Sequence, residues 1–258
     1  MNRKAGISRR HRVAAVFGAM ICGVVFSTSA SQAADRPDLS GVWGVFYHDH
    51  PGGRAGAPAE PTLTKEGAKQ VADFKAKYDV EAVEPGAYCV PGGMPTEMFG
   101  LGGYPTEIIQ KPERITMIIE NDMQVRRIYM DGRDHPDDFP HTRGGHSIGH
   151  WEGDTLVVDT RLISAWPIER WPHSEDTHVV ERISLKPLSA VDVKLRPGLT
   201  PADIGETVLE NIVTTTDPMY DGPQTVKVYS RRLPDKETLE YDCAEGNWWD
   251  LVEATAKK

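Results

Sequence analysis

The sequence predicts an all-β fold: an antiparallel, barrel-like meander of about nine or ten strands with one or two peripheral helices. Two observations support this prediction. From residue 106 onward, apolar and polar residues alternate with a period of two over short runs, which is the pattern of strands with one buried face. Turn-forming residues separate these runs at intervals too short for the helical crossovers that a parallel sheet requires.

The expected elements follow in chain order. A first strand is expected at 38–47, and later strands at 107–110, 115–120, 124–130, 146–151, 155–160, 179–185, 208–215, 226–230 and 239–243. A helix is expected at 65–78, because apolar residues recur along one side and Thr64 can cap its first turn. Residues 80–104 contain glycines and prolines without a period and predict an irregular strap, and Pro201 favours a short helix at 200–206.

The hairpin between 146–151 and 155–160 determines which side chains share a face. Its turn is Glu152-Gly153 or Gly153-Asp154, and the second is favoured because Gly-Asp suits a tight two-residue turn. One face is then apolar enough to be core and carries Ser147, Gly149, Trp151, Leu156, Val158 and Thr160. The other face lines a ligand cavity or faces water, and it carries His146, Ile148, His150, Val157 and Asp159.

The first 33 residues have the pattern of a cleavable secretory signal peptide. Five basic residues lie within the first twelve, an apolar stretch runs from Val13 to Phe26, and Ser31-Gln32-Ala33 places small residues where cleavage requires them. The apolar stretch is short for a membrane anchor. We therefore expect a signal peptide at 1–33, a single β-barrel-like domain at 34–258, and a periplasmic or secreted protein with no integral membrane segment after cleavage.

The charge of the chain argues against two classes of partner. The net charge is −9, and loss of residues 1–33 removes five positive charges and no negative one, which leaves −14. A protein this acidic repels phosphate backbones and anionic membranes. We expect no nucleic-acid partner, and a small-molecule ligand or substrate instead.

Two cysteines, Cys89 and Cys243, belong to the expected mature domain. In an oxidising compartment they most simply form a disulfide bond with each other. The chain-entropy model assigns roughly 4 to 5 kcal/mol to closing so long a loop. Two buried free thiols are the alternative.

Histidine marks the expected functional site, because six of the nine histidines lie between residues 135 and 178. Histidine is the side chain most readily recruited as an acid or base near neutral pH. No nucleophile elbow, phosphate-binding loop, zinc-protease motif or dinucleotide fingerprint is present. The candidate catalytic residues are therefore His173 and His178 as acid and base, with His146, His150 and Asp159 as the second group and His135 as a further candidate.

A metal ion is a less favoured alternative, and no cofactor is expected. On a strand, His146 and His150 lie roughly 13 Å apart, too far to share one ion. A site would need ligands from separate loops, for example His135, His141 and His173. Glu181 and Arg182 are interpreted as surface charges on the strand that follows His178.

Two resemblances extend these inferences. Gly41-x-Trp43 resembles the first strand of lipocalin-type barrels, in which a tryptophan closes one end. The candidate ligand contacts are Trp43, Tyr47 and Trp151. The run GHSIGHWEGDTLVVDT at 145–160, with further motifs at 89–95, 105–110, 173–182 and 241–247, resembles an uncharacterised family of secreted bacterial proteins. That resemblance implies a shared fold and no activity, and it suggests that the motif set includes Cys89, Cys243, His173 and His178.

Taken together, these features favour a secreted or periplasmic enzyme that uses histidine and carboxylate acid–base chemistry, as an isomerase, lyase or hydrolase. Its substrate would be a small hydrophobic or aromatic molecule held in the barrel cavity. A non-catalytic, lipocalin-like carrier of such a molecule is the second hypothesis. A structural envelope protein is the third.

Overall fold

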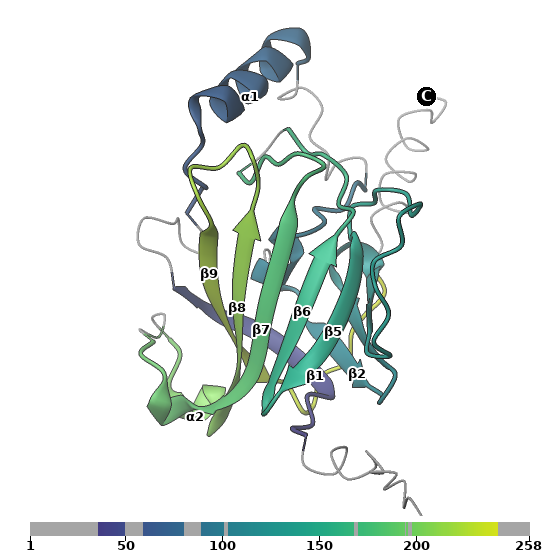
Figure 1. Ribbon diagram of the computed structural model, residues 1–258. Coiled ribbons are helices and arrows are strands. Elements are labelled where there is room, and N and C mark those ends of the chain that lie inside the picture. Colours follow the sequence, from purple (N-terminus) through teal and green to yellow (C-terminus); the bar gives the residue numbers. More distant parts are fainter. Residues whose placement is uncertain are drawn as a thin grey trace, which may run out of the picture. The chain divides into compact units, whose positions relative to one another are not determined.

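A computed structural model describes residues 36–49, 59–79, 89–100, 103–167, 170–193, 195 and 198–241, and only the backbone of 47–49. Within these residues, nine strands form a closed barrel in which each strand pairs with its neighbours in sequence and the last pairs with the first (Figure 1). The predicted fold class, an antiparallel barrel-like meander of nine or ten strands, is confirmed. The expected signal peptide and Cys243 lie outside the described residues, so the disulfide bond stays a prediction.

The described elements follow the predicted ones closely. The strands are β1 (Gly41–Asp49), β2 (Thr106–Gln110), β3 (Arg114–Ile119), β4 (Gln124–Tyr129), β5 (His146–Glu152), β6 (Thr155–Arg161), β7 (His178–Pro187), β8 (Thr207–Thr216) and β9 (Gln224–Arg232). The helices are α1 (Lys65–Lys77) and α2 (Pro201–Ile204), with single 3₁₀ turns η3 (Thr96–Phe99), η5 (Asn121–Met123) and η6 (Leu188–Ala190).

The strand predicted at 239–243 is wrong where the structure describes it. Residues 239–241 are not in a strand, and Leu239 is 65% exposed. Its backbone N–H donates to a carboxylate oxygen of Glu120 at 2.7 Å instead of to a neighbouring strand. The physical reason is closure: β9 already pairs with β1, so the barrel has no free edge to which a tenth strand can add.

The two-residue hairpin between β5 and β6 has the favoured register. Glu152 pairs with Thr155 across the turn Gly153-Asp154, and Ile148 pairs with Asp159. The face predicted to be core points into the barrel, where Leu156, Val158 and Thr160 are fully buried. The opposite face, which carries Asp159, is on the outside of the barrel wall.

The barrel closes where the first strand, β1, pairs with the last, β9. Trp43 in β1 is buried, its indole N–H donates to the Leu39 carbonyl at 2.9 Å, and the guanidinium of Arg232 from β9 lies 4.5 Å from its ring. Cation–π contacts of this kind contribute about 0.5 to 2 kcal/mol. The first-strand tryptophan therefore helps to hold the closing seam.

One pair of neighbouring strands departs from the antiparallel order. Strands β4 and β5 are parallel and pair at two positions, Ile128 with Ser147 and Tyr129 with Ile148. Residues 130–145 connect them and return the chain along the barrel, so that β5 begins beside the end of β4. Residues 124–127 of β4 therefore have no partner strand on that side, which leaves an interruption in the wall.

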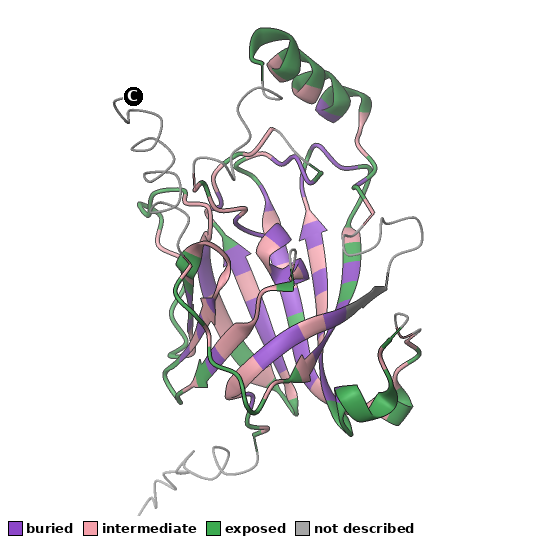
Figure 2. Ribbon diagram, turned by 180° about the vertical axis from the view of Figure 1, so that it is seen from behind, coloured by how far each residue is buried: buried purple, intermediate pink, exposed green. Residues whose placement is uncertain are grey.

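Burial alternates along the strands, as Figure 2 shows by the change of colour from residue to residue. One charged pair, Arg126 of β4 and Glu181 of β7, is buried in this otherwise largely apolar interior. Glu181 is 0% exposed and lies on the inward face of β7 with Val179 and Ile183. The interpretation of Glu181 as a surface charge is therefore wrong, because the period of two that buries its neighbours also turns it inward. Arg182 is exposed, as expected.

The strap before β2 packs into the barrel core through η3. Met94, Met98 and Phe99 are buried in the same hydrophobic cluster as the inward residues of the strands. Arg143 fixes the strap from the β4–β5 connection: its carbonyl accepts from Met94 N at 2.9 Å, and its guanidinium donates to the carbonyls of Pro91 and Gly92. A Cβ on Gly93 would lie 2.6 Å from the Arg143 carbonyl, so glycine permits this close approach.

Helix α1 begins as predicted at its cap. The Thr64 hydroxyl accepts from Gly67 N at 3.0 Å, and the Thr64 N–H donates to the Met219 carbonyl at 2.8 Å. A cap of this type contributes roughly 1 kcal/mol. At the start of helix α2, Thr200 and Asp203 form a capping box, and Pro201 is the first helical residue. Among the described residues, no helix is both long and apolar enough to cross a membrane.

Candidate active site

A cavity of about 280 Å³ lies at the interruption between β4 and β5. Consecutive residues of β4, from Gln124 to Arg127, line it although their side chains alternate between the two faces of the wall. The cavity, called the wall cavity below, therefore lies in the wall of the barrel and contacts residues of both its faces. Its lining consists of Glu97, Gln124, Val125, Arg126, Arg127, Tyr129, Phe139, Thr142, Gly144, Gly145, His146 and Ser147.

Glu97, on η3, lies at the inner end of this cavity and also lines a smaller cavity inside the barrel. One of its carboxylate oxygens accepts from Gly93 N at 3.1 Å. Burial raises the pKa of this carboxyl to about 7, against the opposing effects of the Gly93 N–H and the Arg126 and Arg143 guanidinium groups. Glu97 is thus divided between its acid and base forms at neutral pH, which suits proton transfer in either direction.

Arg126 lies beside Glu97 and is held by a buried polar cluster inside the barrel. Its guanidinium forms an ion pair with Glu181 on β7, and it donates to Ser147 Oγ at 3.1 Å and Thr160 Oγ1 at 2.9 Å. Asn211 donates to the other oxygen of Glu181 at 2.9 Å. These contacts fix the orientation of the guanidinium at the wall of the cavity.

His146 supplies an imidazole at the outer side of the cavity. It is 6% exposed, stacks on Tyr129 with ring centroids 5.2 Å apart, and meets the ring of Phe139 edge-on at 5.3 Å. Burial, followed by the positive charges that His135 and Arg133 can carry, lowers the pKa of His146. The ring is therefore neutral at neutral pH and can accept a proton.

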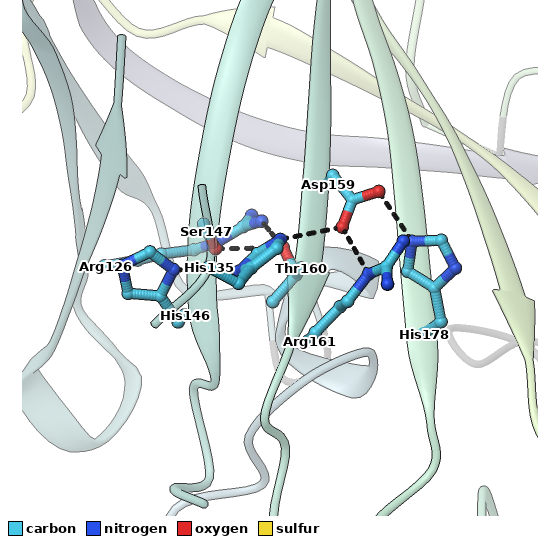
Figure 3. Close-up of polar contacts among 8 residues, drawn as sticks. All are labelled: Arg126, His135, His146, Ser147, Asp159, Thr160, Arg161 and His178. Carbon is cyan, nitrogen blue, oxygen red and sulfur yellow. Dashed lines mark hydrogen bonds and ion pairs between the residues drawn. The ribbon is translucent and has the colours of Figure 1, made fainter. Parts of the chain in front are cut away.

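Two of the predicted histidines, His135 and His178, contact the carboxylate of Asp159, and His146 is joined to them through His135, as Figure 3 shows. Asp159 accepts from His135 Nε2 at 2.9 Å, from His178 Nε2 at 2.7 Å and from Arg161 Nε at 3.1 Å, and Nδ1 of His135 lies 2.9 Å from Nδ1 of His146. Burial alone would raise the pKa of Asp159, but hydrogen bonds from His178 and His135 outweigh it and lower that pKa. Asp159 is therefore ionised near neutral pH.

The structure places the other two candidate histidines elsewhere. His150 is exposed on the outside of β5 and contacts Glu152 at 3.2 Å. His173 is 1% exposed, and its Nδ1 lies 2.8 Å from the Trp171 carbonyl; burial lowers its pKa. The predicted acid–base pair of His173 and His178 is not brought into contact, because His178 points to Asp159 while His173 packs into the interior.

The candidate ligand contacts are also separate from the wall cavity. Trp43 is buried and lines an interior cavity of about 50 Å³. Trp151 is partly buried against the core cluster. The Tyr47 side chain lies outside the described residues. An interior space this small admits one or two water molecules, not a hydrophobic ligand.

The alternative metal ligands do not come together. His141 contacts the Ile163 carbonyl, His173 contacts the Trp171 carbonyl, and His135 bridges His146 and Asp159. In the part of the chain that the structure describes, no group of three or more His, Cys, Asp or Glu side chains has the arrangement of a metal site.

Sequence reasoning missed Glu97 and Arg126, the two charged residues at the inner end of the cavity. Glu97 lies in an aperiodic strap, where no pattern indicates which side chains turn inward. Arg126 did carry a signal. It alternates with Val125 and Arg127 and shares the inward face with Ile128, just as Glu181 shares a face with apolar neighbours. Opposite charges at inward positions of two strands indicate a buried pair.

The raised pKa of Glu97 predicts a pH-dependent change in stability. The folded state prefers the protonated carboxyl, because its pKa of about 7 exceeds the ordinary value of 4.5. This preference costs no stability below pH 4.5 and lowers stability as the pH rises through 7. Glu97→Gln removes that loss, so we expect it to raise the free energy of unfolding at pH 8 by at most about 3 kcal/mol and to change little at pH 4. Urea unfolding at both pH values measures this; equal stability of the two proteins at pH 8 would contradict it.

No protein-family model matches the chain, and no curated protein matches it. The resemblance to a family of secreted bacterial proteins therefore stays an expectation, and the chemistry of the site is argued from its geometry.

Proposed function

We propose that this protein is an acid–base enzyme that moves a proton on a small molecule bound in the wall cavity. The observation that supports this most is the convergence of three functional groups from three separate parts of the chain. The carboxyl of Glu97, the guanidinium of Arg126 and the imidazole of His146 all line one cavity of about 280 Å³. Convergent titratable groups in a concave site are the usual mark of an active site.

Each group has a role that its surroundings support. Glu97 exchanges a proton near neutral pH because burial raises its pKa to about 7. His146 is neutral and serves as the second acid–base group. Arg126 binds a substrate oxygen: its Nη1 contacts the Met98 sulfur at 3.0 Å, and sulfur is a weak acceptor that an oxygen readily replaces.

The arrangement favours an isomerase or a lyase over a hydrolase that uses a serine nucleophile. Ser147 is the hydroxyl residue nearest to His146 in the sequence, but its Oγ accepts from Arg126 and shares a hydrogen bond with Thr160 at 2.9 Å. A serine nucleophile requires contact with its base. Tyr129 and Phe139 line the cavity with aromatic surface, which suits a substrate with a planar or hydrophobic part.

The carrier hypothesis receives less support from the interior of the barrel. Pockets that enclose a small hydrophobic ligand have volumes of about 300 to 1,000 Å³, whereas the interior cavity next to Trp43 measures about 50 Å³. The Arg126–Glu181 pair occupies the interior as well, and an ion pair is a poor lining for a hydrophobic ligand. With the predicted signal peptide and disulfide bond, we propose that this chemistry takes place in the periplasm or outside the cell.

Proton exchange distinguishes an enzyme from a carrier. The mature protein is incubated in D₂O with a panel of small aromatic and carbonyl-containing carbon acids, and deuterium incorporation is followed by NMR. We expect the wild type to exchange a carbon-bound proton of at least one compound, and Glu97→Gln to exchange it far more slowly. Compounds that bind tightly while neither protein exchanges any proton would support the carrier and reject the enzyme.

A further inference from the structure

We propose that Asp159 and His135 are positioning residues that hold Nε2 of His146 unprotonated at the cavity and take over the positive charge when that nitrogen accepts a proton. This inference rests on the proposed function, in which His146 is an acid–base group. Asp159, His135 and His146 form a continuous hydrogen-bonded chain from the outer face of β6 to the cavity wall, with two links of 2.9 Å each (Figure 3).

The direction of the first link follows from the charge of Asp159. An ionised carboxylate accepts hydrogen bonds and donates none. Asp159 receives donors from three sides, His135, Arg161 and His178, so it is well stabilised as an anion. The proton in its bond with His135 is therefore on His135 Nε2.

The second link follows from the first. With Nε2 protonated, a neutral His135 has a lone pair on Nδ1, and this nitrogen must accept the hydrogen bond from Nδ1 of His146. His146 then carries its proton on Nδ1, and its Nε2 has the free lone pair. That nitrogen makes no hydrogen bond to a described residue, and it is the basic atom that the ring offers to a ligand in the cavity.

Uptake of a proton reverses the direction of the His146–His135 hydrogen bond without moving a heavy atom. Nε2 of His146 accepts a proton from the substrate, and the proton on its Nδ1 passes across 2.9 Å to Nδ1 of His135. His135 becomes the imidazolium beside ionised Asp159, while His146 is neutral again and presents an N–H to the cavity. The return step delivers that proton to the product and restores the first state.

The surrounding charges favour a positive charge on His135 over one on His146. Arg133 lies over the ring of Tyr129, 3.9 Å from its centroid, and Tyr129 stacks on His146, so a positive charge on His146 is disfavoured. A positive charge on His135 faces Asp159 directly. Arg161 and His178 also contact Asp159 and compete for its negative charge, which limits the stabilisation but leaves its sign unchanged.

Nitrogen-15 NMR of the histidine rings tests the proposal without any substrate. At pH 8 we expect the wild type to show His146 protonated on Nδ1 and His135 protonated on Nε2. In Asp159→Asn, a neutral amide no longer requires a proton on His135 Nε2, so His146 becomes a mixture of both tautomers, and the fraction of the pair holding an extra proton at a given pH falls at least tenfold. His178→Gln is the matched control, because it removes a contact to Asp159 outside the chain and should leave the His146 tautomer unchanged.

The outcomes separate this inference from the proposed function. His146 protonated on Nε2 in the wild type at pH 8 overturns the proposal, whether or not the protein exchanges substrate protons. The expected tautomers with no proton exchange on any compound uphold the hydrogen-bonded chain and reject the enzyme. If Asp159→Asn does not fold, the wild-type tautomers still decide the question.

Discussion

Glu97→Gln is expected to lower turnover by about 10²- to 10⁴-fold, the usual loss when a general acid or base is removed. The amide has almost the same shape and can still accept the Gly93 N–H through its oxygen, so the cavity keeps its form while losing its titrating group. The pH profile changes as well. The wild type should show a limb near pH 7, set by the pKa of this carboxyl, and the variant should lack it.

Initial rates on the compound that the exchange experiment identifies measure this effect. Glu113→Gln is the control, because it removes an exposed carboxylate from the turn between β2 and β3 and lies outside the cavity lining. Glu97→Gln should also be the more stable protein above pH 7, so a loss of activity cannot be assigned to unfolding. A variant with wild-type rates and a wild-type pH profile would remove Glu97 from the mechanism.

The second large effect is on stability, at the ion pair inside the barrel. Glu181→Leu leaves the Arg126 guanidinium buried without its ion-pair partner, with hydroxyl groups and a sulfur as the acceptors of its described hydrogen bonds. Removing one partner of a buried pair costs about 3 to 5 kcal/mol, because the remaining charge is uncompensated. For a domain of this size, the melting temperature should fall by roughly 6 to 20 °C.

Two further variants show whether burial is the cause. Arg126→Met/Glu181→Leu replaces both charges with apolar groups and should recover most of the lost stability. Glu152→Leu breaks an exposed ion pair, in which a carboxylate oxygen of Glu152 lies 2.7 Å from a guanidinium nitrogen of Arg182. Its loss should lower the free energy of unfolding by less than about 1 kcal/mol. Thermal unfolding followed by circular dichroism measures all three, and equal losses at Glu152 and Glu181 would disprove the buried character of the inner pair.

The sequence predicted the barrel well because the signals that define its strands, alternation and turn residues, lie within short stretches of the chain. A period of two with a Gly153-Asp154 turn is sufficient to give the β5–β6 register and to place Asp159 away from the core. The same period of two also places Glu181 on the inward face of β7, whereas the general rule that charged side chains lie at the surface predicts the opposite. The pattern was the better guide, because it depends on the chain's own geometry.

The site was less predictable because its parts come from segments without a period. Glu97 lies in the strap, and His135 lies in the β4–β5 connection; no spacing rule relates either of them to His146. Asp159, His135, His146 and His178 were all among the predicted candidates, and hydrogen bonds connect them, but the prediction paired His178 with His173 and grouped His150 with His146, and the structure supports neither grouping. What the sequence could not show is the parallel pairing of β4 with β5, which depends on how residues 130–145 return along the barrel.

The short parallel seam between β4 and β5 is the exception in the ladder of the barrel. Seven of the eight sequential strand pairs, and the closing pair of β1 with β9, are antiparallel and carry the ladder that holds the barrel together. The opening is framed by residues 130–145, which contribute Phe139, Thr142, Gly144 and Gly145 to the cavity lining. In the proposed enzyme, substitution of Phe139 would re-line this entrance, whereas Arg143 in the same connection must be kept because it fixes the strap that carries Glu97.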